Sequence, residues 1–350
     1  MSFIIHQDKN LVKITKKSSV FNQNLPPVRV LFFGTPEFGI PSLNRLIRSE
    51  YYDIVAVVCG PDKPVGREQK ITPPPVKVEA QKHKILILQP ENIKDPEFFK
   101  KIEQLKPDLI ITAAYRKILP KEILDIPRWG ALNIHPSLLP KYRGPSPIQY
   151  AILNGDKETG ISIMLMTEKM DEGPILSQKA IQIEKNETAE TLHEKLSLLG
   201  SEVLMWTLER WITLKLMPEE ISGFFYPQEQ DHSKATYTKI ITKEDGKIIW
   251  DNSAEEIERK TRAFNPWPSA YSTIIIKDQE LRLKIFKTKV IKENTEKELG
   301  EVFLTKNDEF AVQTGNNCLI VEELQPAGKN KMSAKEFLNG YPEIIGMILK

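Results

Sequence analysis

Residues 28–39 read VRVLFFGTPEFG, and this stretch decides the fold class. Its first half, residues 28–33, is an apolar run with Arg29 as the single polar member. Runs of this kind are typical of strands that are buried on both faces of a parallel sheet. The turn at residues 34–36 (GTP) ends the run, and a helical pattern follows to about Ser49. The sequence therefore predicts a strand, a turn and a helix here.

The same alternation continues along the chain. Further strands are expected at residues 54–59, 85–88, 109–113, 131–134, 161–166 and 175–183, and helices at 75–83, 96–105, 147–155 and 188–214. Strands that alternate with helices form a sheet that is covered on both faces. We therefore expect an α/β fold with a doubly wound, Rossmann-like, mostly parallel sheet. Residues 60–73 are expected to form a polar loop.

The sequence pattern changes after residues 216–233, from alternating strands and helices to short strands. Residues 216–233 themselves combine Pro, Gly and polar residues with little periodicity. A helix is expected at 254–264, followed by five short strands at 270–276, 281–290, 300–304, 310–314 and 318–324. Short strands separated by turn signals are typical of a small barrel, here an OB-like one. The expected organisation is a flexible N-terminal extension (1–27), a catalytic domain (28–215), a linker (216–233) and a barrel domain (234–350).

The composition limits the classes of protein to be considered. The net charge of the 350-residue chain is only +2, so any contact with RNA must come from local basic surface. Cys59 and Cys318 lie in apolar runs without a zinc-site spacing, and we expect both to be buried free thiols in a reducing compartment. No apolar run approaches the ~18 residues of a membrane span. We therefore expect no contact with a membrane.

Residues 1–27 bear on the compartment. They lack the long apolar core of a secretory signal, and they contain no arginine, which organellar transit peptides favour. We expect a cytoplasmic protein, with an organellar matrix as the alternative if these residues form a transit peptide.

Three polar residues are the candidates for a catalytic site. Asn133 and His135 end one predicted strand, and because they are two positions apart their side chains share a face. Asp171 follows in the turn MDEG (170–173) between two later strands. Ligands of open α/β sheets bind beyond the carboxyl ends of the strands, so a short turn can bring Asp171 over the same edge.

An amide, an imidazole and a carboxylate together suit acyl transfer to an amine. The amide and a protonated imidazole can donate hydrogen bonds to the oxygen that gains charge when the acyl carbon becomes tetrahedral. The carboxylate favours the protonated imidazole and can help to move the proton of the attacking amine. Each residue is a weak signal by itself, because an aspartate in such a turn usually has a structural role.

The wider pattern resembles a known family. Residues 133–144 (NIHPSLLPKYRG), followed by 170–173 (MDEG), are similar to the folate-dependent formyltransferases. The likeness runs from about Val28 to Gly340 and includes FGTPEF at 33–38, FNPWP at 264–268 and LQPAGK at 324–329. The motifs of the second domain resemble the members that formylate methionine on initiator tRNA.

This resemblance implies roles for individual residues. Asn133, His135 and Asp171 would form the catalytic trio. The donor 10-formyltetrahydrofolate would lie against Ser137, Leu138, Leu139 and Pro140, with Tyr115, Ile118, Leu119 and Pro120 lining the pterin pocket largely through the backbone. The second domain would help to hold initiator methionyl-tRNA. A metal is not expected, and the protein is expected to act as a monomer.

The expected tRNA contacts are basic residues in two places. Lys63, Arg67 and Lys70 lie in a loop (61–70) that resembles the tRNA-recognition insertion of the family, and Lys287 and Lys289 share a face of a barrel strand. Arginine can clamp a phosphate and stack on an unpaired base.

The chain departs from the family pattern at two positions. Arg116 stands where a glycine usually follows the tyrosine of the pterin stretch, and Glu68 stands where a glycine usually follows the arginine of the loop. A negative charge beside Arg67 should weaken its attraction to phosphate.

Several alternatives share parts of this pattern. A formyltransferase acting on a sugar-nucleotide or glycinamide-ribonucleotide amine, or a folate-dependent formyl hydrolase, would keep the catalytic trio. A nicotinamide-dependent oxidoreductase is disfavoured because GTPEFG at 34–39 lacks the G-x-G-x-x-G spacing. A non-catalytic RNA-binding protein would keep the barrel without needing the trio.

Overall fold

The computed structural model describes residues 26–66, 68–216, 226–293 and 295–350. The chain forms two compact units. The first comprises the described residues up to Pro147 together with Thr159–Ile181 and His193–Thr238, and the second comprises Ile148–Glu158, Gln182–Leu192 and Lys239–Lys350. Most of the expected N-terminal extension and residues 217–225 of the expected linker lie outside the described residues. The expected domain boundaries remain predictions.

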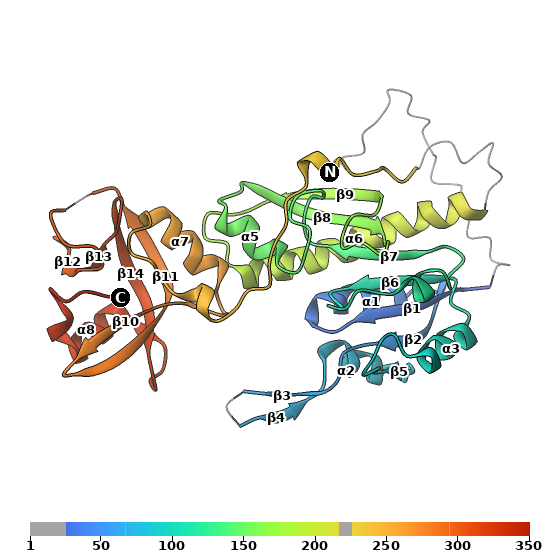
Figure 1. Ribbon diagram of the computed structural model, residues 1–350, viewed down its shortest axis with the longest axis horizontal. Coiled ribbons are helices and arrows are strands. Elements are labelled where there is room, and N and C mark those ends of the chain that lie inside the picture. Colours follow the sequence, from blue (N-terminus) through green and yellow to red (C-terminus); the bar gives the residue numbers. More distant parts are fainter. Residues whose placement is uncertain (1–25, 67, 217–225, 294) are drawn as a thin grey trace. The chain divides into compact units, whose positions relative to one another are not determined.

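The first unit is built on a seven-stranded sheet in the order β5-β2-β1-β6-β7-β8-β9 (Figure 1). Its strands are β1 (Val28–Gly34), β2 (Tyr52–Val58), β5 (Ile87–Leu88), β6 (Leu109–Ala113), β7 (Ala131–His135), β8 (Glu158–Leu165) and β9 (Ile175–Gln182). The pairs from β5 to β7 are parallel, and β7 pairs with β8 antiparallel. The expected mostly parallel, Rossmann-like sheet is confirmed.

Helices cover both faces of this sheet because its strands are apolar on both sides. On one face α3 (Pro96–Leu105) and α4 (Lys121–Leu124) pack with Leu31 and Ile110 in a single core. Residues one position along these strands face the opposite side. There α1 (Ile40–Ile47) and α6 (Ala189–Leu216) are joined by a hydrogen bond of 2.9 Å from Arg45 to Ser201. Shorter helices complete the unit: α2 (Pro75–Lys82), η1 (Glu37–Gly39) and η2 (His232–Lys234).

The expected polar loop at 60–73 is instead a small hairpin. Lys63–Val65 (β3) pairs antiparallel with Lys70–Thr72 (β4). Pro64 disfavours a strand in sequence reasoning, but a two-stranded ribbon has an outer edge where the missing N–H costs nothing. The hairpin projects away from the seven-stranded sheet (Figure 1).

The second unit is an antiparallel sheet with helices around it. The strand order is β10-β11-β14-β13-β12, and β15 pairs with β14. The strands are β10 (Ala270–Ile276), β11 (Gln279–Ile291), β12 (Val302–Leu304), β13 (Phe310–Gln313), β14 (Cys318–Pro326) and β15 (Met332–Ser333), and the helices are α5 (Pro147–Leu153), α7 (Ala254–Ala263), α8 (Ala334–Gly340), η3 (Glu244–Gly246) and η4 (Pro342–Ile344). All five expected strands are present. Helix α8 was not expected, although Ser333 and Glu336 form a capping box at its start.

The last residues of the chain join the two edges of this sheet. The backbone of Val302 in β12 exchanges hydrogen bonds with Gly346 and Met347, at 2.7 and 2.9 Å. The backbone of Thr273 in β10 exchanges two with Lys350, at 3.0 and 2.8 Å. Both edge strands thus gain partners, as the expected barrel requires.

Cys59 and Cys318 are both buried and free, as expected. Among the residues that the structure describes, no helix has the length and apolarity needed to cross a bilayer.

The close approach of α6 to β7 generates a test of the packing. A Cβ on Gly200 would lie 2.9 Å from Cγ2 of the buried Ile134. Gly200→Val should therefore lower the free energy of unfolding by about 1–3 kcal/mol through overpacking. Urea denaturation followed by tryptophan fluorescence measures this. Leu198→Ala is the matched control, because Leu198 lies on the same helix and is 59% exposed. An unfolding midpoint that is equal in both variants would contradict the packing.

Candidate active site

The fold brings the three predicted catalytic side chains together. Asn133 and His135 lie at the carboxyl end of β7, and Asp171 lies in the loop between β8 and β9. Nδ2 of Asn133 is 3.4 Å from Oδ1 of Asp171, and Nδ1 of His135 is 3.6 Å from the same oxygen. All three are largely shielded from solvent, and His135 is only 3% exposed. Two nitrogens therefore converge on one carboxylate oxygen.

The Asp171 carboxylate is held firmly at its other oxygen. Oδ2 accepts a hydrogen bond of 2.8 Å from the backbone N–H of Gly144. The contacts of Oδ1 with Asn133 and His135 are 0.6 Å or more longer. The carboxylate is thus anchored at one side and only loosely engaged at the side that faces the donors.

The second nitrogen of His135 has a fixed role. Nε2 lies 3.0 Å from the carbonyl oxygen of Tyr142. A carbonyl oxygen can only accept, so Nε2 carries a proton and donates it in this contact. Of the two ring nitrogens, Nδ1 has the longer contact and is the one that can be shared with a substrate.

This arrangement suits stabilisation of a developing oxyanion. A substrate oxygen close to Nδ2 of Asn133 and Nδ1 of His135 would meet the amide donor and, when the imidazole is protonated on both nitrogens, a second donor from the ring. The carboxylate of Asp171 lies beside both and can take part in moving a proton. The predicted site residues Asn133, His135 and Asp171 therefore form a geometry that acyl transfer can use.

The predicted pterin stretch lies at the switch point of the sheet. The chain winds from β1 through β2 to β5 on one side and resumes at β6 on the other, so the strand order reverses between β1 and β6. Residues 114–120 follow β6 directly, and η1 follows β1. Ligands of open α/β sheets bind in the crevice at this point.

Many of the predicted folate residues are structural in the fold. Tyr115 and Leu119 belong to the core under α3, and Ser137 and Leu139 are almost fully buried. By contrast Ile118 is 58% exposed. Three other members are partly exposed: Pro120, Leu138 and Pro140. The structure therefore leaves mainly the backbone and these side chains for contact with a ligand.

Side chains of the neighbouring strands hold residues 137–140, the SLLP segment, by hydrogen bonds to its backbone. Oγ of Ser162 donates to the carbonyl of Ser137 at 2.6 Å and accepts from the N–H of Leu139 at 3.0 Å. Nε2 of Gln178 donates to the carbonyl of Leu139 at 2.8 Å. Side chains from β8 and β9 thus fix the backbone of this segment.

Two buried hydroxyls, of Thr112 in β6 and of Tyr115 just after it, have no hydrogen-bond partner within the described residues. Both side chains are at least 95% buried. Thr112 is the neighbour of Asn133 across the β6–β7 pair. Burial raises the pKa of Tyr115 to about 12, with a smaller contribution from Cys59, so the phenol stays neutral and can donate. Buried polar groups are rarely left without a partner, so both hydroxyls remain available to water or to a polar ligand.

Arg116 adopts the backbone that a glycine would adopt. Its φ is 65°, in the left-handed region. A non-glycine residue there costs on the order of 1 kcal/mol. Arg116 thus occupies a left-handed turn position in the pterin stretch at this energetic cost, and its side chain is exposed.

The predicted tRNA-binding residues of the first unit are on the hairpin. Lys63 is directly opposite Thr72, and Lys70 is two positions from Thr72 on the same strand. Opposite residues and residues two apart share a face, so the two exposed lysines point the same way. Arg67 lies outside the described residues.

A bulge in β11 sets the face of the lysines in the second unit. The register with β14 shifts around Phe286 and Lys287. Leu283 and Ile285 face the core before this bulge, whereas Lys287 and Lys289 are exposed after it. Lys287 forms an ion pair of 3.1 Å with Glu322, and this contact raises its pKa. In the part of the chain that the structure describes, Lys289 has no ion-pair partner.

Sequence reasoning assigned no individual role to several residues that shape this site. Gly144 and Tyr142 act through their backbone, and a motif of side chains does not reveal such roles. Gln230 is buried at 5% exposure and donates at 2.8 Å to the carbonyls of Asp171 and Gly173. It lies in the expected linker, where nothing in the local sequence marked it.

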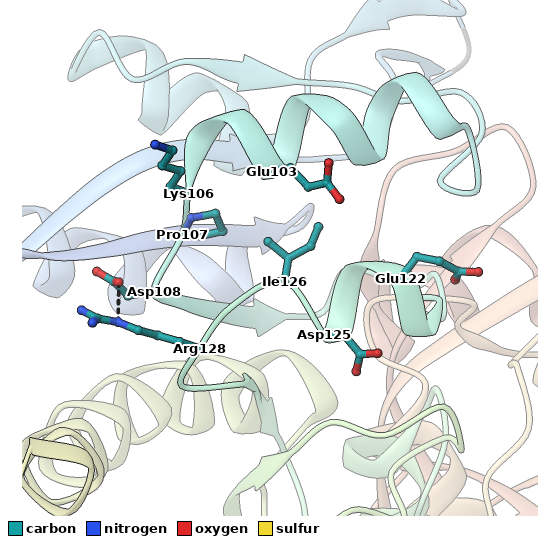
Figure 2. Close-up of a pocket in the computed structure, with 8 residues that line it drawn as sticks. All are labelled: Glu103, Lys106, Pro107, Asp108, Glu122, Asp125, Ile126 and Arg128. Atoms are coloured by element: carbon teal, nitrogen blue, oxygen red, sulfur yellow. Dashed lines mark ion pairs between the residues drawn. The ribbon is translucent and has the colours of Figure 1, made fainter.

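An open cleft of about 490 Å³ lies elsewhere on the first unit (Figure 2). It is lined by residues before β6 and β7, among them Asp108 and Arg128, which form an ion pair of 2.8 Å. Those residues are at the amino ends of the strands, the edge opposite to His135. The cleft is therefore not part of the catalytic constellation. No cluster of three or more potential metal ligands occurs in residues 26–66, 68–216, 226–293 and 295–350.

Comparison with known proteins shows to which family this chain is related. Residues 28–208 match the family model "Formyl transferase", and residues 240–342 match "Formyl transferase, C-terminal domain". The methionyl-tRNA formyltransferase of Bacillus subtilis (strain 168) is 44% identical over 313 residues, which cover 89% of this chain and 94% of the relative.

Two solved structures have a similar fold. The N-formyltransferase from Helicobacter canadensis, in complex with folinic acid and dTDP-3-aminofucose, matches 84% of this chain and 98% of its own, with 19% identity and a TM-score of 0.59. HypX from Aquifex aeolicus, in complex with tetrahydrofolic acid, matches 91% of this chain with 16% identity and a TM-score of 0.58, and this chain spans about half of its length, 48%. The chain belongs to the formyl transferase family and carries both the N-terminal and the C-terminal domain of that family.

Proposed function

We propose that this protein transfers the formyl group of 10-formyltetrahydrofolate to the amino group of methionine on initiator tRNA, giving N-formylmethionyl-tRNA for the initiation of translation. The convergence of Asn133 and His135 on one oxygen of Asp171 carries the proposal. Membership of the formyl transferase family and 44% identity to a methionyl-tRNA formyltransferase support it. We further propose that it acts in the cytoplasm as a monomer.

In the proposed reaction the amine nitrogen bonds to the formyl carbon, and the bond from that carbon to N10 of the folate then breaks. Asn133 and His135 donate hydrogen bonds to the formyl oxygen while it carries negative charge. Asp171 keeps its place through Gly144 and accepts, directly or through water, the proton that the amine sheds. That proton ends on N10, so atoms and charges balance without an oxidant.

The folate is proposed to lie in the crevice at the switch point between β1 and β6. The backbone of residues 114–120 and the exposed Ile118 would line it, and the orphan hydroxyl of Thr112 lies at its edge. Tyr115, Leu119, Ser137 and Leu139 would support this site from the core, and Pro120, Leu138 and Pro140 would border it.

The tRNA is proposed to contact the hairpin and the β11 face. Lys63 and Lys70 share one face of the hairpin, with Arg67 in the same loop, and Lys287 and Lys289 are exposed on β11. Lysine contacts to phosphate position an RNA without reading its sequence. We propose that the hairpin, by contrast, selects the unpaired end of the initiator acceptor stem.

The direct test is transfer of labelled formyl from 10-formyltetrahydrofolate to methionyl-initiator tRNA, with methionyl-elongator tRNA as control. We expect formylation of the initiator and much less of the elongator. Absence of transfer to both tRNAs, while a folate analogue still raises the melting temperature, would redirect the search to sugar-nucleotide amines. Absence of transfer and of folate stabilisation would favour a non-catalytic RNA-binding protein.

His135→Ala tests the catalytic role. Loss of a donor to the developing charge should lower kcat about 10²- to 10⁴-fold while the affinity for tRNA stays the same. Single-turnover formylation and filter binding measure the two quantities. His83→Ala is the control, since His83 is the C-cap of α2 and its ring lies 3.7 Å from Glu79 of the same helix. Equal losses of kcat and of tRNA affinity in His135→Ala would argue for a structural role.

Lys289→Ala tests the β11 face. The variant should bind tRNA more weakly, and the slope of log K against log salt should fall by about one, because one phosphate contact is lost. The KM for the folate should not change. Lys335→Ala, on the exposed side of α8, is the matched control. If both variants bind tRNA alike at all salt concentrations, β11 does not form the RNA surface.

A further inference from the structure

Arg143 is a buried cation beside the candidate active site. Its side chain is 1% exposed and is among the largest fully buried side chains of the described residues. A guanidinium is retained in such a place only when its donors are satisfied, because removal of a charge from water costs several kcal/mol. The partners of Arg143 therefore indicate what it holds.

The donors of Arg143 reach residues far away in the sequence. Nε and Nη2 donate to Oε1 of Gln230 at 3.1 and 2.7 Å, and Nη2 also donates to Nδ1 of His232 at 3.0 Å. Nη1 donates to the hydroxyl of Tyr237 at 3.1 Å and lies 3.4 Å from Oε1 of Glu172. Arg143 thus joins the loop after β7, to which it belongs, with the Asp171 turn and residues 230–237.

Gln230 carries this connection on to Asp171. Its amide oxygen accepts from Arg143, so its amide nitrogen is oriented toward the turn. That nitrogen donates to the carbonyls of Asp171 and Gly173, both at 2.8 Å. One carboxamide therefore spans the distance between the guanidinium and the backbone that carries the carboxylate.

The Asp171 turn needs such support. Asp171 has a φ of 55°, a left-handed conformation that costs an aspartate on the order of 1 kcal/mol. A Cβ on Gly173 would lie 1.9 Å from the carbonyl oxygen of Leu165, so this turn is tightly packed on β8. Strained conformations persist when the surroundings over-determine them.

Residues 228–238, which we call the strap, are fixed to the same loops by their backbone. Gln228 exchanges two hydrogen bonds of 2.8 Å with Ile175 just after the turn. Thr236 accepts from the N–H of Arg143 and Thr238 donates to its carbonyl, both at 2.8 Å. The strap therefore pairs with the chain before Asp171, at Arg143, and after it, at Ile175. Gln230 lies between these two points of attachment.

We propose that Arg143 and Gln230 are positioning residues that, through the strap, hold the Asp171 turn so that one carboxylate oxygen faces Asn133 and His135. The proposal rests on the proposed function insofar as Asp171 is catalytic. Neither residue touches the reacting atoms, so each acts through Asp171.

Gln230→Glu is the informative variant. It keeps an oxygen for Arg143 but replaces the donor to the carbonyls of Asp171 and Gly173 with a second, repelling oxygen. Displacement of a catalytic group by about 1 Å can cost about a hundredfold in rate. We expect kcat for formyl transfer to fall about ten- to a hundredfold, with the KM for tRNA unchanged. Arg143→Lys should give the same pattern, because lysine keeps the charge but lacks the planar fork.

A double-mutant cycle with Asp171→Asn separates positioning from general damage. If Gln230 acts through Asp171, Gln230→Glu should cause no further loss of kcat in the Asp171→Asn background. Equal fold losses in both backgrounds would overturn the proposal. Ser233→Ala is the matched control, since it lies on the strap, is exposed and binds Asp231 alone among the described residues; its kcat should equal that of the wild type.

A second measurement does not depend on activity. The N–H of Gly144 donates to Asp171, so its hydrogen exchange, observed in protein labelled with 15N-glycine, reports where the carboxylate is. Exchange at Gly144 should accelerate in Gln230→Glu and in Arg143→Lys, but not in Ser233→Ala. Unchanged exchange in both variants would overturn the positioning role. If the wild type transfers no formyl but the exchange responds as expected, the proposed function fails and the positioning role stands.

Discussion

The hydrogen bond between the N–H of Gly144 and Oδ2 of Asp171 is the contact on which the candidate site depends. The sheet by itself orients Asn133 and His135, because both belong to β7. It cannot orient Asp171, which lies in a loop. The 2.8 Å bond from Gly144 ties that loop to the loop after β7 and occupies one carboxylate oxygen. The other oxygen is left facing two donor nitrogens at longer distances. Because Oδ2 is fixed by Gly144, Oδ1 stays in place opposite Asn133 and His135 and remains available to accept a proton.

The surroundings of this bond consist largely of backbone groups and buried supports. Ser162 and Gln178 hold the SLLP segment by its backbone, and Tyr142 fixes the ring of His135 through a carbonyl. A motif in the sequence therefore includes residues of two kinds, those that are exposed and available to a ligand and those that hold the backbone in place. Burial separates them here, since Ser137 and Leu139 are inside whereas Ile118 is exposed.

Sequence reasoning anticipated the elements whose patterns are local. The strands from Val28 onward, the long helix and the five strands of the second unit all have strong apolar periodicity, and all are present. It missed the hairpin at 63–72, because Pro64 argues against a strand and an isolated ribbon has no apolar face. Helix α8 was missed although its capping box was legible. The bulge in β11, which reverses the face of the following lysines, depends on pairing with β14 and has no local signature.

The sequence by itself determined the class of the fold and the side-chain types of the candidate site, because apolar periodicity and the side chains at strand ends are local properties of the chain. It also identified Asn133, His135 and Asp171 as a set. Only the tertiary structure decided that Asp171 is held by Gly144, and that the buried Arg143 is satisfied by Gln230, a residue 87 positions away in the expected linker. The reason is physical: a buried donor must find an acceptor, and which one it finds depends on how distant segments pack rather than on their neighbours in sequence.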